Sequence, residues 1–108
     1  DRMTRAQQEE AALGCQQKLL KAGSEVNDAL IADQTSQGKR RLLDKQIASL
    51  QTALQSTSLL MEHGNTTYLE VLTARQSLLS AQLSQTANHF TEIQSLINLY
   101  RALGGGQE

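Results

Sequence analysis

Few residues in this chain have side chains suited to catalysis or to metal binding. The sequence contains one cysteine, Cys15, and two histidines, His63 and His89. The histidines lie a helix length apart, whereas a zinc site needs three or four converging ligands, so we expect no metal site. No Ser-His-Asp set, no pair of catalytic carboxylates and no phosphate-binding loop can be assembled. The sequence therefore predicts a protein that is not an enzyme and needs no cofactor.

The charges are balanced and well mixed along the chain. Ten Lys and Arg stand against eleven Asp and Glu, for a formal net charge of −1. Without a basic stripe, nucleic-acid binding is not expected, and the run Lys39-Arg40-Arg41 is interpreted as a solvated helix face. No apolar run approaches the roughly 20 residues that span a bilayer. The charged start predicts that no signal peptide is included.

The elements that position these side chains are expected to be helices. The 108 residues include 18 Leu, 14 Gln and 12 Ala but no proline, and Val and Ile together number six. Leu, Gln and Ala lose little side-chain freedom in a helix, whereas sheets draw on β-branched and aromatic residues. The composition thus predicts an all-α fold with a thin apolar core.

A strong turn signal divides the chain at residues 63–67 (HGNTT). Gly64 reaches positive φ without cost, and Thr66 or Thr67 could cap the helix that follows, with Glu70 close by. The triple glycine at 104–106 is expected to end the last helix. The sequence therefore predicts two long helices, at about residues 3–62 and 67–103, whose length is typical of coiled coils.

Apolar residues recur in both helices at alternating steps of three and four, the heptad pattern of a coiled coil. We expect the chain to fold back at residues 63–67 so that these two seams face each other in a long antiparallel hairpin. Met61 then meets Leu69 near the turn. Arg40 lies near Phe90, where a cation–π contact could form. About 25 N-terminal residues are left without a partner helix. The first seam contains Ala29, Ser36, Arg40, Leu43, Ile47, Leu50, Leu54, Thr57 and Met61, and extends back to Cys15 as a line of small residues. The second contains Leu69, Leu72, Gln76, Leu79, Leu83, Thr86, Phe90, Ile93, Ile97 and Tyr100.

The second helix carries another apolar line, offset from its seam by about two residues. This line contains Val71, Ala74, Leu78, Ala81, Leu96, Leu99 and Leu103. A helix with two apolar lines must bury two flanks, which one partner helix cannot cover. The pattern predicts a sheet or tube of helices in which each helix contacts a neighbour on either side.

Three motifs resemble the TolC-type outer-membrane efflux proteins, in the right order and spacing. They are residues 25–30 (EVNDAL), 64–82 (GNTTYLEVLTARQSLLSAQ) and 99–106 (LYRALGGG). Members of that family are trimers in which a short β-barrel in the outer membrane continues as a long α-helical barrel across the periplasm. The resemblance implies that this chain is the second helical hairpin of that α-barrel, a piece of a longer protein, with Gly64 at the periplasmic tip.

The resemblance also implies a function. The parent protein would form a passive efflux duct for small molecules in the outer membrane, with this segment in the periplasm. It would work with a periplasmic adaptor protein and with an inner-membrane pump that supplies the energy. Family members often carry an aromatic residue three positions before the tip glycine, where this chain has Met61.

Two groups of residues near the tip are candidate sites. An acidic residue at the position of Glu70 can ring the entrance of the resembling ducts, whereas the simpler interpretation is a carboxylate near the positive end of a helix dipole. Thr73, one turn further, stands where some members carry a second carboxylate. A tip contact with an adaptor needs small residues, although the same residues would also suit a plain hairpin turn. The candidate adaptor contacts are Gly64, Asn65, Thr66 and Thr67.

A different class of function fits the same heptads. It is a generic coiled-coil interaction or stalk module, such as the hairpin of an adaptor protein. The double apolar line and the three motifs favour the efflux duct. In either case the apolar flanks predict that the isolated segment self-associates, because exposed apolar surface of this extent favours association.

Overall fold

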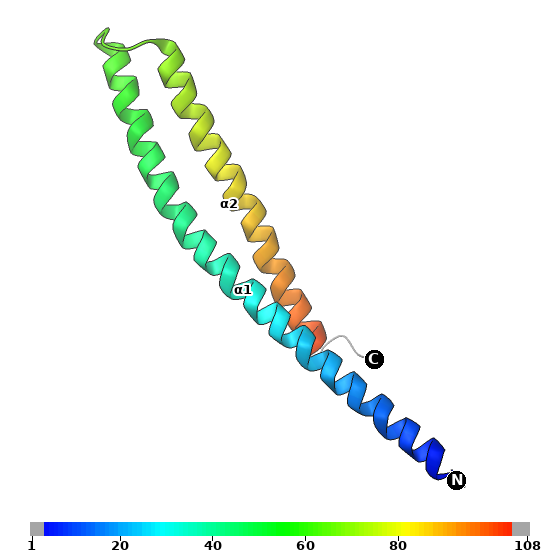
Figure 1. Ribbon diagram of the computed structural model, residues 1–108. Helices are drawn as coiled ribbons and strands as arrows, with labels where there is room; N and C mark the ends of the chain where they lie inside the picture. The colour runs from blue at the N-terminus through cyan, green and yellow to red at the C-terminus, as the bar shows by residue number, and fades with distance from the viewer. Residues whose placement is uncertain (1–3, 105–108) are drawn as a thin grey trace.

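The computed structural model describes residues 4–104, which form two helices joined by a short turn (Figure 1). Helix α1 spans Arg5–Glu62 and helix α2 spans Tyr68–Ala102. The two helices run antiparallel and side by side in a body of 90 × 21 × 17 Å. The all-α hairpin predicted from the sequence is confirmed. Both helices begin and end close to the predicted bounds, and Met3, the predicted first helical residue, lies outside the described residues.

Local signals set both ends of α1. At its start, the Gln7 N–H donates to the Thr4 hydroxyl at 3.1 Å, and the Thr4 N–H donates to Gln7 Oε1 at 2.9 Å. This reciprocal pair is a capping box, which satisfies two N–H groups that the helix cannot. At the other end, Gly64 adopts φ +75°. The Gly64 N–H then donates to Met61 O and the Asn65 N–H to Leu60 O, at 3.0 and 2.8 Å, which is a Schellman motif.

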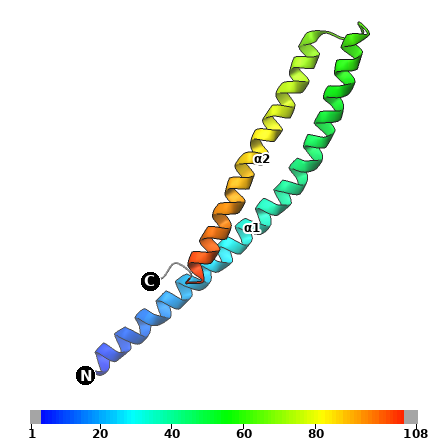
Figure 2. The same cartoon turned by 180° about the vertical axis from the view of Figure 1, so that it is seen from behind.

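Helix α1 packs against α2 through the seam predicted for it. Ala29, Ser36 and Leu43 on this seam are buried, and Ile47 and Met61 are half-buried. The N-terminal part of α1, up to about residue 24, extends past the end of α2, which both views show (Figures 1 and 2). The predicted overhang is therefore present. Cys15 lies on it and is exposed, as expected of a residue with no partner helix in this chain.

The face of α2 that packs against α1 is opposite to the predicted one. Leu69, Leu83 and Phe90, on the predicted seam, are 69%, 61% and 70% exposed. The buried residues of α2 are Val71 and Ala81 of the other line together with the polar residues Asn88, Glu92 and Ser95 on the same side of the helix. Leu96 and Leu103, which were also assigned to that line, are 51% and 69% exposed. Positions two residues apart on a helix differ by about 200°, so the two lines lie on opposed faces and only one can meet α1. The predicted contact of the seam at Leu69 and Phe90 with α1 is wrong.

The register of the hairpin is close to the predicted one although the face differs. Arg40 lies at the level of α2 where Phe90 was expected, but its guanidinium pairs with Glu92, two residues further along. The predicted cation–π contact is thus replaced by an ion pair. The turn at residues 63–67 fixes which residues of the two helices lie side by side. The rotation of α2 about its own axis depends on other contacts.

The interface between the helices is half polar. Within residues 4–104, the buried apolar residues are Ala29, Leu43, Val71 and Ala81, and the buried polar residues are Ser36, Asn88, Glu92 and Ser95. Apolar burial is the main favourable term in folding, and here it is concentrated between the turn and Leu43. The predicted thin core is confirmed, and the half of the hairpin away from the turn depends on polar contacts.

Candidate functional site

Glu70 lies in the first turn of α2, exposed, next to the turn of the hairpin. The Thr66 hydroxyl donates a hydrogen bond to its carboxylate. Thr67 occupies the N-cap position, but its side chain makes no capping bond. The predicted cap by a threonine side chain is therefore wrong. The Thr66 hydroxyl bonds to the carboxylate of Glu70 instead, and that carboxylate lies near the positive end of the helix dipole.

Thr73 lies one turn further along α2 and is exposed. Its hydroxyl donates to the carbonyl of Leu69 at 2.9 Å. This bond to the preceding turn satisfies the hydroxyl within its own helix, a common arrangement for threonine in helices. Of the two gate candidates, Glu70 and Thr73, only Glu70 carries a negative charge.

The turn between the two helices consists of small, uncharged residues. Gly64, Asn65 and Thr67 are exposed and Thr66 is half-buried. Next to them, His63 is also exposed, and its Nδ1 lies 2.8 Å from the carbonyl of Leu59. The His63 side chain therefore lies against the last turn of α1. Residues 64–67 follow it and form the turn at the end of the hairpin.

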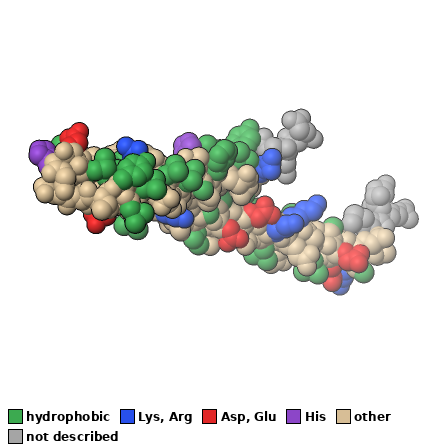
Figure 3. Space-filling model, turned by 90° about the horizontal axis from the view of Figure 1, so that it is seen from above, with side chains coloured by type: hydrophobic (Ala, Val, Ile, Leu, Met, Phe, Trp, Pro, Cys, Tyr) green, Lys and Arg blue, Asp and Glu red, His purple; other side chains and the backbone are tan. Residues whose placement is uncertain are grey.

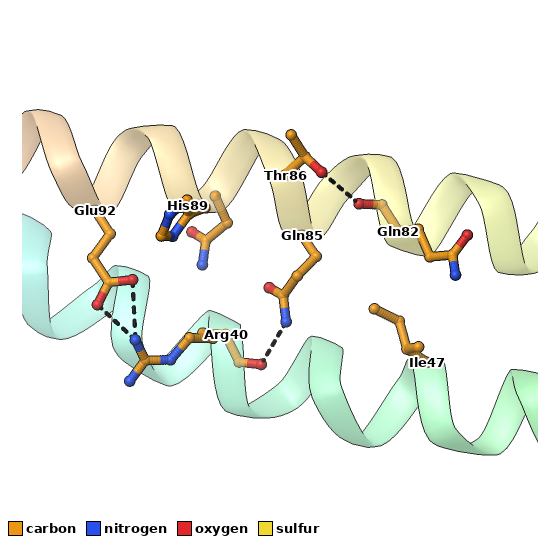
Figure 4. Close-up of a pocket in the computed structure, with 8 residues that line it drawn as sticks. Arg40, Ile47, Gln82, Gln85, Thr86, His89 and Glu92 are labelled. Atoms are coloured by element: carbon orange, nitrogen blue, oxygen red, sulfur yellow. Dashed lines mark hydrogen bonds and ion pairs between the residues drawn. The ribbon is translucent and has the colours of Figure 1, made fainter.

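The middle of the hairpin holds a set of interhelical polar contacts, shown in part in Figure 4. Arg40 Nη1 donates to both carboxylate oxygens of Glu92, at 3.1 and 2.9 Å. Asn88 Nδ2 donates to the backbone carbonyl of Ser36 at 2.8 Å. Gln85 Nε2 donates to the Arg40 carbonyl at 3.3 Å and to Asp44 Oδ1 at 2.5 Å. We call these six residues, Ser36, Arg40, Asp44, Gln85, Asn88 and Glu92, the polar cluster. Sequence reasoning missed these pairs because their members are more than 40 residues apart.

The face of α2 that points away from α1 is strongly apolar. We call it the outward face, and it contains Leu69, Leu72, Leu79, Leu83, Phe90, Ile93, Ile97 and Tyr100, which are 36–70% exposed. Figure 3 shows hydrophobic side chains gathered over α2 along much of its length. This surface is the seam that the sequence assigned to the contact with α1.

Helix α1 carries a second apolar line as well, which the sequence analysis missed. Its residues are Leu13, Leu20, Ile31, Leu42 and Leu60, which are 47–67% exposed. Their spacings of 7, 11 and 18 residues are close to whole numbers of helical turns, so they share one side of α1. The signal was present in the sequence, but the spacing of eleven does not fit the heptad template.

Two of the three motifs noted in the sequence meet at the end of α2. Glu25, Asp28 and Ala29 of the first motif line a groove together with Arg101 of the last motif. The glycine that follows α2, Gly104, has φ +87°, a conformation that favours glycine. Helix α2 therefore ends at Ala102, at the level of Ala29 and close to the predicted end of the second helix.

Neither metal chemistry nor a membrane span is visible in the part of the chain that the structure describes. No three His, Cys, Asp or Glu side chains of residues 4–104 gather where they could hold a metal ion. Neither α1 nor α2 contains a stretch long and apolar enough to cross a bilayer.

Comparison with known proteins identifies the class to which such a hairpin belongs. The sequence matches the family of outer membrane efflux proteins over residues 2–105. It is 35% identical over 99 residues to the cation efflux system protein CusC of Escherichia coli, which covers 92% of this chain. It is 32% identical over 104 residues to the pyoverdine export outer membrane protein OpmQ of Pseudomonas putida, which covers 96%. None of the solved structures compared with the chain matches it significantly.

The chain belongs to the outer membrane efflux protein family. The resemblance drawn from the three motifs is thereby confirmed. The chain spans 22% of the length of both relatives, CusC and OpmQ. It is thus similar to one segment of these proteins, and in this chain that segment forms a helical hairpin.

Proposed function

We propose that this hairpin is part of the wall, and forms the periplasmic tip, of a trimeric outer-membrane duct through which small molecules leave passively. The observation that carries the proposal is that α2 packs one face against α1 while the opposed, apolar face stays exposed. A helix with contact surfaces on opposed sides fits between two neighbours. A ring of such helices is a tube whose remaining faces are polar.

The outward face needs a partner on energetic grounds. Burying one large aliphatic or aromatic side chain contributes about 1.5–3 kcal/mol, and eight such residues are 36–70% exposed here. The apolar line of α1 adds a second uncovered strip on the other helix. Neighbouring hairpins of the same duct would cover both strips, which supports a place inside a closed wall rather than at its edge.

The relatives support a conduit rather than a selective binding site. CusC is named for a cation efflux system and OpmQ for export of pyoverdine, and this chain is similar to both over nearly its whole length. Cargo chemistry that differs this much fits a water-filled passage. In the proposed function an inner-membrane pump and a periplasmic adaptor supply energy and selection.

Glu70 is the proposed gate residue at the periplasmic entrance. It is exposed at the tip, and Thr66 holds its carboxylate near the start of α2. Three copies in a trimer would attract cations and repel anions. Thr73, one turn further into the entrance, would line it without charge.

The gate is tested by Glu70→Lys in the full-length protein, reconstituted in a planar bilayer. We expect cation selectivity and block by divalent cations to fall sharply. The matched control is Glu62→Lys, which makes the same change at the last residue of α1. Equal effects of both substitutions, or no effect of Glu70→Lys, would remove Glu70 from the gate. A full-length protein that forms no pore would contradict the duct itself.

The tip residues 64–67 are the proposed contact with the adaptor. Their exposed, uncharged backbone lets another tip approach closely. A photo-crosslinking side chain at Asn65 should capture the adaptor in cells, whereas the same group at Leu13, on the overhang, should not. Capture from both positions, or from neither, would count against a tip contact.

The alternative is a coiled-coil interaction or stalk module, which would also bury the two uncovered apolar strips against a partner. Both functions predict that the isolated 108-residue chain self-associates. Sedimentation should show association between micromolar and millimolar concentration, weakened by the substitutions Leu83→Ser and Phe90→Ser on the outward face. A monomer throughout that range would contradict the need for neighbours. The pore measurement separates the duct from the stalk.

A further inference from the structure

The face of α2 that packs against α1 is the less apolar of its two faces. Toward the end away from the turn it buries Asn88, Glu92 and Ser95, while Leu83 and Phe90 on the outward face stay mostly exposed. Apolar burial by itself would favour packing the outward face against α1, because the free energy gained is roughly proportional to the apolar area removed from water. Some other interaction must therefore decide how α2 is rotated.

The polar cluster supplies that interaction. Its three α2 members, Gln85, Asn88 and Glu92, follow each other at steps of three and four and so share one face. Each bonds to α1: Glu92 to Arg40 through both carboxylate oxygens, Asn88 to the carbonyl of Ser36, and Gln85 to Asp44 and the carbonyl of Arg40. A half-turn rotation of α2 would break all of these bonds at once.

The opposite arrangement is a realistic competitor. With α2 rotated by half a turn, Leu83 would meet Ile47 and Phe90 would lie beside Arg40, while Glu92 would reach water. That state would turn Leu83 and Phe90 toward α1 in place of Asn88 and Glu92. The seam of α1 turns polar at Ser36 and Arg40, so only the polar face of α2 matches it there.

We propose that the polar cluster selects which face of α2 packs inside the chain and thereby reserves the more apolar face for a neighbour. Arg40 is the central positioning residue. The Glu92 side chain is 11% exposed and that of Arg40 46%, so the nearly buried carboxylate depends on the arginine for its charge partner. A buried carboxylate that loses its partner is strongly unfavourable. The inference concerns packing within the hairpin and stands whether or not the duct is the correct function.

The test uses two pairs of cysteines in the full-length protein, with Cys15 and any other cysteine replaced by serine. Leu43→Cys with Ala81→Cys reports the observed face, because both residues line one groove between the helices. Ile47→Cys with Leu83→Cys reports the rotated face. A short bifunctional thiol reagent joins whichever pair lies across the interface, and the yield of each cross-link is measured on a gel.

Arg40→Leu is the decisive substitution. We expect the ratio of observed-face to rotated-face cross-link to fall about tenfold or more, where tenfold corresponds to about 1.4 kcal/mol between the two arrangements. Adding Glu92→Leu should restore the ratio, because the carboxylate that drives the rotation is gone and an apolar pair replaces the ion pair. Arg41→Leu is the matched control, since Arg41 is the exposed neighbour of Arg40, and should leave the ratio unchanged.

Three outcomes would overturn the proposal. The first is an unchanged ratio in Arg40→Leu, which would mean that neighbouring helices set the rotation of α2. The second is an equal change in Arg41→Leu. The third is failure of the Arg40→Leu, Glu92→Leu variant to recover the observed-face cross-link. Arg40→Leu alone could prevent folding of the hairpin. The double variant still gives an answer then, because recovery on adding Glu92→Leu assigns the defect to the unpaired carboxylate.

Discussion

Leu42 and Leu43 are adjacent leucines with opposite environments, and they provide a sharp test of how α1 packs. Leu43 is 7% exposed on the seam that meets α2, whereas Leu42 is 67% exposed on the other side of α1. A buried Leu→Ala substitution costs about 2–5 kcal/mol, and the lower end applies here because two helices can close partly around the cavity. For Leu43→Ala in the 108-residue chain we therefore expect a loss of about 2–3 kcal/mol in the free energy of unfolding.

Leu42→Ala should change that free energy by no more than about 0.5 kcal/mol, as expected of an exposed site. The midpoint of thermal unfolding should fall by roughly 10–20 °C for Leu43→Ala, at about 4–8 °C per kcal/mol for a chain of this size. Urea unfolding followed by far-UV circular dichroism measures both variants, at a concentration where sedimentation shows one species. Equal losses, or a larger loss for Leu42→Ala, would refute the assignment of the α1 seam.

Other substitutions test the ends and turns of the helices. Gly64→Ala should destabilise the chain by about 1 kcal/mol, because a side chain is strained at φ +75° although nothing lies within 4 Å of it. Gly38→Ala, inside α1 with equal space, should instead stabilise it by about 0.5–1 kcal/mol; urea unfolding of both variants should give opposite signs, and equal signs would contradict the backbone argument. Thr4→Ala should cost about 0.5–2 kcal/mol of local helix stability, and hydrogen exchange should rise at the start of α1 but not at the turn; a change at both would mean that the capping box is not a local feature.

Much of the fold was predictable because it depends on local signals. The absence of proline and the abundance of Leu, Gln and Ala set two long helices, and Gly64 set the point where the chain folds back. The seam of α1 followed from heptad spacing around Leu43. Each of these features arises from residues within a few turns of one another, which is the range over which sequence patterns are informative.

The rotation of α2 was not predictable from the same patterns. Periodicity finds both apolar lines of α2 but does not choose between them, and the more apolar line was assigned to α1. The choice depends on bonds such as Arg40 to Glu92, between residues far apart in the chain. One signal was available: the α1 seam becomes polar at Ser36 and Arg40. The face of α2 that contains Val71 and Ala81 also becomes polar at that level, with Asn88 and Glu92. Matching polar to polar across the hairpin would have found the correct face.

The exposure of the turn was predictable, but the roles of its residues stay predictions. Glu70, Gly64, Asn65 and Thr67 are exposed and Thr66 is half-buried. The bond from Thr66 to Glu70 was not foreseen, because capping rules describe bonds from a side chain to the backbone and this bond joins two side chains.

The unbroken length of α1 has a mechanical consequence. Its 58 residues run without interruption from the overhang to the turn, and the ion pair of Arg40 with Glu92 ties it to α2 partway along. At 1.5 Å per residue, that tie lies about 33 Å from the tip end of α1 and about 53 Å from its start. A stiff rod held there acts as a lever. A tilt of about 5° about the tie carries the tip by roughly 3 Å and the far end by roughly 5 Å in the opposite direction. If α1 tilts as one body, movement at one end of the hairpin is carried to the other without any change inside the helix.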